Sequence, residues 1–488
     1  PCRSRGLGDV YKRQIYMNID KFYINGKFIT PHGEEKIDIV NPATEEIIGF
    51  VISGSEDDVN NAVDSANAAF TLASNLTIQQ RKKILEEIIE GMQERRSDFG
   101  QVISDEMGAP MSLALKAQFG SGTIHFKNTL SVIEQFSFNE VHDNITINKL
   151  PIGPVGMITP WNWPLNQMCT KVASAIAAGT SFVLKPSEIT PGAAQILAEI
   201  IDTTSLPKGV FNLIHGYGHT VGKLMSSHSG LEMISFTGST RAGIDIQKNA
   251  ADNVKRVSLE LGGKSPNIIL DDVDLEQAVN MGMKQCFFNT GQSCSAPTRM
   301  LVPQNLMEQA TEIAVAAASE MITGDPKEED TFLGPISNEK QFKKVQELIQ
   351  IGIDEGAELS CGGVGRPDGM KKGFYVKPTV FSNVVNSMQI AKEEIFGPVI
   401  CLIGYSNIEE AIDIANDTPY GLSSMISCGD LNKGQQIAKR IRSGQVILNR
   451  ISRGDYPAPF GGFKMSGNGR EHGLFGIDEY LEVQAVIT

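Results

Sequence analysis

The sequence has no excess of basic residues and no long apolar run. Its 488 residues include 43 Lys and Arg against 57 Asp and Glu, giving a formal net charge of -14. This charge repels phosphate backbones and anionic membranes, so nucleic acid is not an expected partner. No uncharged apolar stretch reaches the roughly 18 residues of a transmembrane helix, and the N-terminus lacks the apolar core of a signal peptide. We expect no membrane partner.

Paired cysteines and metal-ligand spacings are also absent. The seven cysteines are scattered, with no CxxC pair and no disulfide-like spacing. That usage is typical of reduced thiols in the cytoplasm. The seven histidines show no HExxH motif and no Cys/His ligand spacing, so no metal site is expected.

The first sixteen residues, PCRSRGLGDVYKRQIY, differ in character from the rest of the chain. They are basic, contain glycine and show no periodicity, whereas Met17 begins a run that resembles an ordinary start. We hypothesise that residues 1–16 are a non-native extension from a cloning or sequencing artefact. Their deletion should leave activity and stability unchanged.

Helix and short-strand patterns alternate through most of the chain, which indicates an α/β protein of two or three domains. A helix is predicted over 77–93, because Thr77 and Gln80 can form a capping box and apolar residues follow on one helical face. Strands are predicted at 155–159, 181–186, 209–214 and 233–238. With helical segments between them, these runs favour a parallel sheet with right-handed crossovers.

A second α/β series begins after about residue 263 and includes PNIILDD, TRMLVP, PVICLIGY and GQVILN. The two series meet at LELGGKSP, where Gly262, Gly263 and Pro266 mark a bend. Clefts between domains are common ligand sites, so a site is expected here. The chain ends in IDEYLEVQAVIT, a strand that needs a sheet to join, which another subunit could supply.

Cys294, in NTGQSCSAPTR, is the first candidate for chemistry. Gly291 permits close backbone approach and Ser293 and Ser295 are small, so a substrate could reach the thiol. The thiolate is the attacking form, and a positive local potential would lower the thiol pKa. The alternative is a buried, inert cysteine. Five of the other cysteines are interpreted in that way: Cys169, Cys286, Cys361, Cys401 and Cys428.

Glu260 and Asn162 are the other candidates. Glu260 follows apolar residues at a strand end, where apolar surroundings would raise its pKa toward that of a general base; an exposed strand residue is the alternative. Asn162 lies in TPWNWP, a stiff loop with both tryptophans of the chain. Its amide could donate to an oxyanion, or simply pack at a turn.

Three cofactor patterns are individually weak. GYGHTVG at 216–222 resembles a GxGxxG phosphate loop with one extra residue. FTGST at 236–240 follows a predicted strand, and its N–H groups with the Ser239 hydroxyl could bind a pyrophosphate. Lys185 and Glu188 end another strand and could bind ribose hydroxyls.

Together these segments resemble the aldehyde dehydrogenase superfamily. The matching motifs are PWNWP, LKPSE, FTGST, LELGGKSP, GQSC, EEIFGPV and PFGGFKMSGNGRE, in the family's order over about residues 17–488. The resemblance implies a modified Rossmann NAD-binding domain at 17–127 and 151–262, an α/β catalytic domain at 263–465, and a small β oligomerisation element at 128–150 and 466–488. It also implies a homodimer or homotetramer.

The resemblance carries catalytic roles to five positions. Cys294 matches the nucleophile and Glu260 the general base. Asn162 matches the oxyanion-hole amide, which acts with the Cys294 backbone N–H. Lys171 and Glu471 match a proton-relay pair. The implied reaction oxidises an aldehyde to an acid through a thioester on the cysteine, which water then hydrolyses.

The resemblance also implies NAD as the cofactor. Lys185 and Glu188 match ligands of the adenosine ribose, and Glu394 and Phe396 match those of the nicotinamide ribose and ring. A carboxylate at Glu188 would repel a 2′-phosphate, so NAD is predicted over NADP. The full set of expected cofactor contacts is Thr159, Trp161, Lys185, Glu188, Gly238, Ser239, Gly262, Glu394 and Phe396.

The physiological aldehyde is open. Polar Gln167 and Thr170, and Gly454 where a bulky ring often stands, predict a roomy, polar tunnel. Arg450 and Arg453 could meet a distal carboxylate of a semialdehyde, although a solvated loop is the favoured interpretation. The expected tunnel residues are Trp163, Gln167, Thr170, Ser293, Ser295, Gly454 and Phe460.

Three rival functions fit parts of the pattern. In a CoA-acylating relative CoA takes the acyl group, but that branch typically lacks the base that Glu260 provides. A silent structural or binding member would have lost the nucleophile or base. A thiol hydrolase normally uses a histidine base, and no histidine here lies in a comparable motif.

Overall fold

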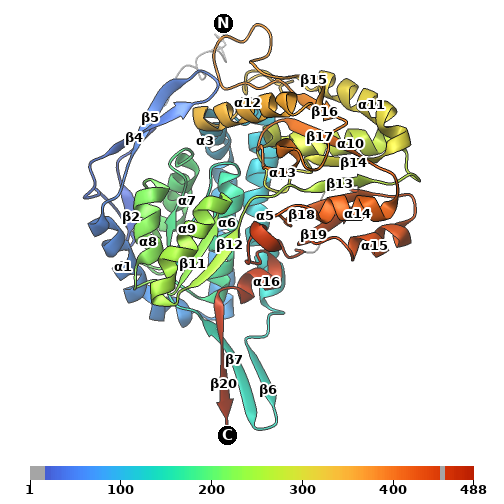
Figure 1. The fold of residues 1–488 in the computed structure, drawn as a ribbon. Coiled ribbons are helices and arrows are strands. Elements are labelled where there is room, and N and C mark those ends of the chain that lie inside the picture. The colour runs from blue at the N-terminus through green and yellow to red at the C-terminus, as the bar shows by residue number, and fades with distance from the viewer. Residues whose placement is uncertain (1–16, 451–456) are drawn as a thin grey trace, which may run out of the picture.

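The computed structural model describes residues 17–450 and 457–488. The hypothesis about residues 1–16, and the predictions for Arg453 and Gly454, fall outside the described residues. The described chain forms two α/β bodies that lie against each other, with a narrow sheet projecting from one of them (Figure 1).

The N-terminal body is built around a seven-stranded sheet. The strand order is β12-β11-β8-β9-β10-β2-β3, and β8 to β12 pair in parallel while β2 and β3 are antiparallel. The strands are β2 (Phe22–Ile24), β3 (Lys27–Ile29), β8 (Val155–Ile158), β9 (Phe182–Lys185), β10 (Phe211–Leu213), β11 (Met233–Thr237) and β12 (Arg256–Glu260). The four strands predicted at 155–159, 181–186, 209–214 and 233–238 are confirmed as β8 to β11.

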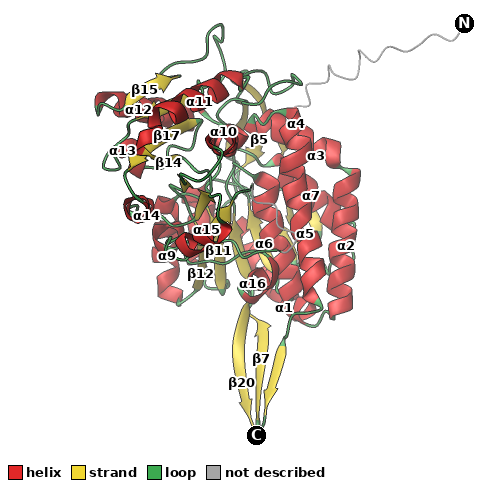
Figure 2. Ribbon diagram, turned by 90° about the vertical axis from the view of Figure 1, so that its right-hand side faces the viewer, coloured by secondary structure: helices red, strands yellow, loops and turns green. Residues whose placement is uncertain are grey.

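Helices cover this sheet, and α2, α3, α5 and α7 are the red ribbons on the right of Figure 2. They are α1 (Glu56–Ser74), α2 (Ile78–Glu94), α3 (Arg96–Met107), α4 (Met111–Leu113), α5 (Phe119–Ile133), α6 (Pro164–Ala178), α7 (Gly192–Asp202), α8 (Lys223–Ser227) and α9 (Thr240–Ala250). The predicted capping box of α2 is present in both directions between Thr77 and Gln80. Helix α6 begins with Pro164 and ends at a left-handed Gly179, as the conformational preferences of these residues favour.

The second body contains another seven-stranded sheet, in the order β15-β16-β17-β14-β13-β18-β19, parallel except for β15. Its strands are β13 (Pro266–Ile269), β14 (Arg299–Pro303), β15 (Glu358–Cys361), β16 (Thr379–Ser382), β17 (Val399–Tyr405), β18 (Ser423–Ser427) and β19 (Gln445–Leu448). Its helices are α10 (Leu275–Phe287), α11 (Met307–Glu320), α12 (Glu339–Asp354), α13 (Gln389–Lys392), α14 (Ile408–Asn416) and α15 (Leu431–Ala438). The mixed α/β fold class is confirmed.

The projecting sheet pairs the end of the chain with a hairpin. Its order is β20-β7-β6, from β6 (Asn139–His142), β7 (Ile145–Pro151) and β20 (Leu481–Ile487). The terminal strand therefore joins a sheet of its own chain, with Leu481 opposite Pro151 and Ile487 opposite Ile145. A separate three-stranded sheet joins β1 (Met17–Ile19), β5 (Glu46–Ile52) and β4 (Lys36–Asn41).

The segments beside the projecting sheet belong to the first body. Helix α5 continues to Ile133, and α16 (Gly473–Asp478) contributes Ile477 to the same apolar core as α5 and α6. The three-domain division remains a prediction. The strand pairs of the projecting sheet span residues 139–151 and 481–487, which is less than the 128–150 and 466–488 expected for the oligomerisation element. Within the described ranges, we find no helix with the length and apolarity to cross a bilayer.

Candidate active site

The candidate residues lie at the carboxyl ends of parallel strands. In the first sheet the strand order reverses between β8 and β11, the position at which open α/β sheets bind ligands. Asn162 follows β8, Ser239 follows β11 and Glu260 ends β12. Cys294 comes from the second body, just before β14. The site is therefore assembled from both bodies, as the bend at 262–266 predicted.

Asn162 is held against the segment that carries Cys294. Its Nδ2 donates to the Gln292 backbone oxygen at 3.0 Å, and its side chain is 3 % exposed. The Asn162 backbone oxygen accepts from Asn289 Nδ2 at 2.9 Å and from Gln118 Nε2 at 3.1 Å. Because an amide nitrogen carries two protons, one N–H of Asn162 is left for another acceptor.

Gln118 belongs to a π-helical turn, Ala114–Gln118 (η1), that precedes α5. Such turns are rare in helices and often occur at functional sites. The Gln118 amide also donates to Asn289 Oδ1 at 3.1 Å. A fully buried amide network therefore fixes the loop that holds Asn162 relative to the segment before Cys294.

The backbone before Cys294 is strained. Asn289 and Thr290 have φ of 57° and 56°, left-handed values that are unfavourable for Thr. Gly291 has φ 72°, and a Cβ built there would lie 2.1 Å from the Gly397 carbonyl oxygen. The close backbone approach expected at Gly291 is confirmed, and its partner is the EEIFGPV segment.

The Cys294 thiol lies among acidic groups. Burial, followed by the nearby Glu394 and Glu260 carboxylates, raises the pKa of the Cys294 thiol to about 12. The sequence analysis considered a positive potential at the thiol, but the surroundings are acidic. The carboxylates belong to EEIFGPV and LELGG, which are distant from Cys294 in the sequence. The free thiol therefore needs a base or a bound cation before it can act as a thiolate.

Glu260 is buried and has no polar partner. Its side chain is 2 % exposed, and neither carboxylate oxygen accepts a hydrogen bond within the described part of the chain. Burial and the Glu471 carboxylate raise the pKa of Glu260 well above its ordinary value, while Lys171 and Arg470 oppose this. A carboxyl with such a pKa can exchange a proton near neutrality, as a general base requires.

Lys171 and Glu471, expected as a pair, are in contact. Lys171 Nζ lies 2.6 Å from Glu471 Oε1, and the two side chains are 1 % and 9 % exposed. Lys171 comes from α6 and Glu471 from the segment before α16. Both charges act on the Glu260 carboxyl: Glu471 raises its pKa and Lys171 lowers it.

The residues of the first body expected to contact a dinucleotide lie at or just after the carboxyl ends of β8, β9, β11 and β12. Lys185 ends β9, and its Nζ lies 2.8 Å from the Pro186 oxygen and 3.5 Å from Glu188 Oε2. Ser239 caps α9, an eleven-residue helix whose N-terminus faces the same edge. The buried hydroxyls of Thr159 and Thr237 have no partner in the described residues, which suits contacts to a bound polar molecule.

Glu394 and Phe396 reach the same place from the second body. Glu394 Oε1 accepts from the Gly263 N–H at 3.0 Å, and a Cβ at Gly262 would lie 2.5 Å from Glu394 Oε2. Phe396 has φ 60°, and its ring meets Trp161 edge-on with centroids 5.4 Å apart. A larger residue at position 262 would displace the Glu394 carboxylate, and Trp161 of the first body contacts Phe396 of the second.

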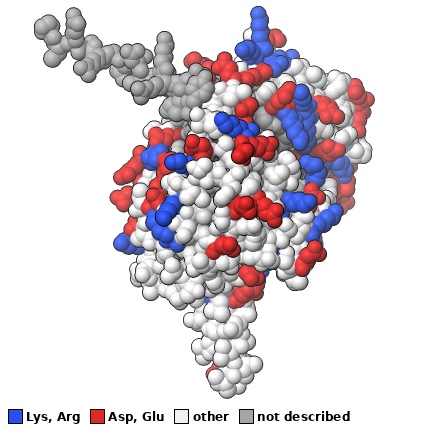
Figure 3. All heavy atoms as spheres, turned by 90° about the vertical axis from the view of Figure 1, so that its left-hand side faces the viewer, with Lys and Arg blue, Asp and Glu red and all other residues white. Residues whose placement is uncertain are grey.

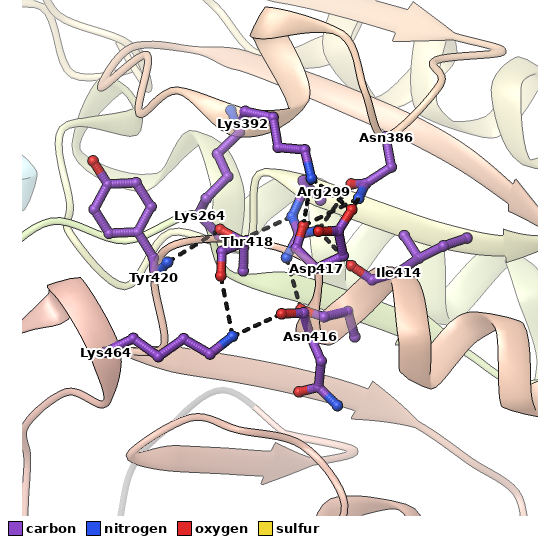
Figure 4. Close-up of polar contacts among 11 residues, drawn as sticks. Lys264, Arg299, Asn386, Lys392, Ile414, Asn416, Asp417, Thr418, Tyr420 and Lys464 are labelled. Atoms are coloured by element: carbon purple, nitrogen blue, oxygen red, sulfur yellow. Dashed lines mark hydrogen bonds and ion pairs between the residues drawn. The ribbon is translucent and has the colours of Figure 1, made fainter.

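The buried Arg299 guanidinium braces the segment after Gly263. Arg299 Nε donates to the Lys264 oxygen at 3.0 Å, and Nη1 donates to the Ile414 oxygen at 2.8 Å. Figure 4 shows these contacts and the neighbouring Lys392 and Lys464, which bind the loop around Asp417. This network holds in place the backbone that Glu394 contacts.

The expected tunnel residues are partly brought together. Trp163 Nε1 donates to Ser293 Oγ at 2.8 Å, which joins the Asn162 loop to the Cys294 segment a second time. Gln167 and Thr170 are buried on α6 beside it, and the Thr170 hydroxyl has no partner in the described chain. Ser295 is half-buried next to Cys294.

Phe460 stacks on a residue that sequence reasoning missed. Its ring lies against that of His472 with centroids 5.4 Å apart, and His472 in turn lies 4.6 Å from the His125 ring. Ser235 and Tyr480 were also missed: Ser235 accepts from Lys171, and Tyr480 donates to Ser235. Single histidine, serine and tyrosine residues carry no spacing signal, so only the assembled fold reveals them.

No group of three potential metal ligands occurs in residues 17–450 and 457–488.

Comparisons with known proteins agree with this geometry. The model of the "Aldehyde dehydrogenase family" matches residues 28–486. A protein from Pseudomonas sp. named 3-succinoylsemialdehyde-pyridine dehydrogenase is 47 % identical over 468 residues, covering 96 % of this chain and 98 % of that protein.

Solved structures match equally well. Aldehyde dehydrogenase C from Pseudomonas syringae, a mutant in complex with NAD⁺ and octanal, is 49 % identical with a TM-score of 0.95, covering 96 % of each chain. Betaine aldehyde dehydrogenase from Staphylococcus aureus, a mutant in complex with NAD⁺, is 35 % identical with a TM-score of 0.93 and 96 % of each chain covered.

The chain belongs to the aldehyde dehydrogenase family. It is an oxidoreductase that uses NAD to oxidise an aldehyde to a carboxylic acid.

Proposed function

We propose that this chain performs the oxidation with Cys294 as nucleophile, Asn162 as oxyanion donor and Glu260 as general base. The observation that carries the proposal is the fixed Asn162 amide, bound to the Gln292 oxygen two residues before Cys294. A donor held in place before the reaction stabilises charge without reorganisation, which is the largest single contribution in many enzymes.

The nucleophile is the Cys294 sulfur in its thiolate form. The thiol proton passes to a base, and the sulfur attacks the aldehyde carbon. The oxyanion that forms is held by the free N–H of Asn162 and the Cys294 backbone N–H. NAD would supply the hydride acceptor for this step, and Cys294 would keep the acyl group as a thioester when the carbonyl reforms.

Hydrolysis of the thioester depends on Glu260. Its carboxylate takes a proton from water, and the water oxygen attacks the thioester carbon, releasing the acid and the thiolate. The unpartnered oxygens of Glu260 are available for this water. The Lys171 charge favours the ionised form of the base, whereas the Glu471 charge opposes it. The presence of this base favours water over CoA as the acyl acceptor.

The residues that would hold NAD fit a dinucleotide. Ser239 and the N-terminus of α9 would bind the pyrophosphate, Lys185 and Glu188 the adenosine ribose, and Glu394 the nicotinamide ribose. The orphaned Thr159 hydroxyl supports a bound polar ligand at this edge. The Glu188 carboxylate favours NAD over NADP, because it would repel a 2′-phosphate.

For the substrate we propose an extended aldehyde with a polar group along its chain. Gln167 and Thr170 place an amide and a hydroxyl group on α6 near Trp163, which is expected to line the substrate tunnel. The buried Thr170 hydroxyl has no partner in the described chain, which favours a polar ligand. The two similar Pseudomonas proteins act on or bind a pyridine-bearing semialdehyde and octanal, which are both long molecules.

We further propose a homodimer or homotetramer assembled through the projecting sheet. Val483 and Ile487 share one face of this sheet and are 68 % and 72 % exposed, and Val141 on the opposite face is 71 % exposed. Figure 3 shows this sheet almost free of charged side chains on the face in view. An exposed apolar surface of this kind marks a protein contact. Light scattering after chromatography should give twofold or fourfold the 52.9 kDa chain mass, and Val483→Glu with Ile487→Glu should give the monomer.

A cytoplasmic location is proposed from the thiols, since each cysteine among the described residues is free.

The catalytic proposal is tested with aliphatic, aromatic and carboxylated aldehydes, measuring NADH and free acid with and without CoA. Wild type should form acid without CoA, and Cys294→Ala should form no NADH. NADH formation by Cys294→Ala at the wild-type rate would remove the nucleophile assignment.

A further inference from the structure

The Lys171 ammonium has a second buried partner besides Glu471. Lys171 Nζ donates to Ser235 Oγ at 3.0 Å, and Ser235 Oγ also accepts from the Tyr480 hydroxyl at 3.1 Å. Ser235 and Tyr480 are 2 % and 3 % exposed. A hydroxyl oxygen has two lone pairs, so these two donors occupy both and leave the serine a single orientation.

The chain brings these groups together from separate elements. Lys171 lies on α6, Ser235 in the middle of β11, and Tyr480 immediately before β20. In the parallel pair of β11 and β12, Ser235 lies opposite Ser258 and Thr237 opposite Glu260. Ser235 is therefore part of the rigid strand beside the one that carries Glu260, whereas Glu471 lies in a loop-like segment outside the sheet.

A lysine side chain has four rotatable bonds and a charge that two carboxylates attract. With Glu471 as its only anchor, the ammonium would be drawn to that side and away from Glu260. The Ser235 hydroxyl ties it to the sheet instead, and Tyr480 prevents the hydroxyl from turning away. The ammonium is therefore held from two sides, by Glu471 and by Ser235.

We propose that Ser235 and Tyr480 are positioning residues that hold the Lys171 ammonium between Glu471 and Glu260, so that the general base is ionised when water attacks the thioester. This inference rests on the proposed role of Glu260. It gives the serine and tyrosine an indirect part in hydrolysis, since neither is assigned a contact with the substrate.

Electrostatics give the direction of the effect. The charged groups that act on Glu260 are Glu471 and Glu479, which raise its pKa, and Lys171 and Arg470, which lower it. The Glu260 carboxylate also raises the pKa of the Cys294 thiol. Loss of the Ser235 anchor weakens the lowering by Lys171, so the Glu260 pKa rises further and less base is ionised at neutral pH.

The test measures decay of the acyl-enzyme as a function of pH. Wild type, Ser235→Ala and Tyr480→Phe are mixed with NAD and a limiting aldehyde, and the acylated protein is followed by quenching and intact mass. In both variants, the rise of the decay rate with pH should be displaced to higher pH by about half to one unit. At pH values below this rise the acyl-enzyme should decay roughly 3- to 10-fold more slowly than in wild type, and at higher pH the rate should recover.

Two controls separate positioning from general damage. Ser235→Thr keeps the hydroxyl and should restore the wild-type profile, and Ser104→Ala removes a buried hydroxyl on α3 that has no partner in the described chain. Wild-type profiles for Ser235→Ala and Tyr480→Phe would overturn the inference, as would an equal loss at every pH. If Glu260→Gln also hydrolyses normally, the proposed base itself is wrong; if only Glu260→Gln is impaired, the positioning role alone fails.

Discussion

Asn162 Nδ2 donates to the Gln292 backbone oxygen at 3.0 Å, which fixes the side-chain amide of one body to the nucleophile segment of the other. Asn162→Asp keeps the size of the side chain but replaces the donor with a carboxylate. Loss of one oxyanion donor lowers the rate about 10²- to 10³-fold. We expect that fall in kcat/KM, measured by NADH formation.

NAD affinity serves as the control for Asn162→Asp, because the proposed role of the amide is toward the substrate oxygen and not toward the dinucleotide. Tryptophan fluorescence titration with NAD should give a Kd near that of wild type. An unchanged kcat/KM in a folded Asn162→Asp variant would exclude an oxyanion role for this amide.

Gly291→Ala should damage the active site through the backbone. Its φ of 72° and a Cβ at 2.1 Å from the Gly397 oxygen leave no room for a methyl group. Backbone strain of this kind costs about 1–3 kcal/mol, so we expect a lower Tm together with loss of activity, since Cys294 lies three residues on.

The matched substitution is Gly120→Ala, in helix α5. A Cβ there meets nothing within 4 Å, and alanine is the better helix former by about 0.5–1 kcal/mol. This variant should be active with an equal or higher Tm. If both glycine variants behave alike, the steric explanation for Gly291 is incorrect.

Glu188→Ser should relax the preference for NAD. Removal of the carboxylate beside Lys185 removes its repulsion of a 2′-phosphate and leaves the lysine cation to attract it. We expect kcat/KM with NADP to rise about 10-fold, which corresponds to about 1.4 kcal/mol. Wild-type enzyme with equal efficiency on both dinucleotides would contradict the assignment of Glu188.

Glu106 makes stability depend on pH. It is fully buried on α3, accepts from the Gly192 N–H at 3.1 Å, and burial raises its pKa from 4.5 to about 8. Because the folded value is the higher one, its contribution to stability is complete below pH 4.5 and is lost as pH rises toward 8. Glu106→Gln should therefore raise Tm at pH 9 but not at pH 5. An equal change in Tm at both pH values would show that Glu106 does not titrate in this range.

The sequence predicted those features that depend on neighbouring residues. The capping box of Thr77 and Gln80 and the strands β8 to β11 are local properties, and each is present. The catalytic candidates followed from motifs in a fixed order, and the structure brings Asn162 and Cys294 to one site.

Features that depend on distant segments were not predictable in the same way. The high pKa of Cys294 arises from burial and then from the Glu394 and Glu260 carboxylates, and the Lys171 anchor comes from β11 and from the residue before β20. The terminal strand was expected to need a sheet, but its pairing with β7 of the same chain is set by contacts over more than 300 residues.

The most direct test follows the thioester on Cys294 in Glu260→Gln. The variant is mixed with NAD and an aldehyde, quenched, digested and analysed by mass spectrometry. Oxidation without hydrolysis should give one equivalent of NADH per active site and an acyl group on the peptide that contains Cys294. Continued release of acid at the wild-type rate, or an acyl group on another residue, would contradict the proposed mechanism.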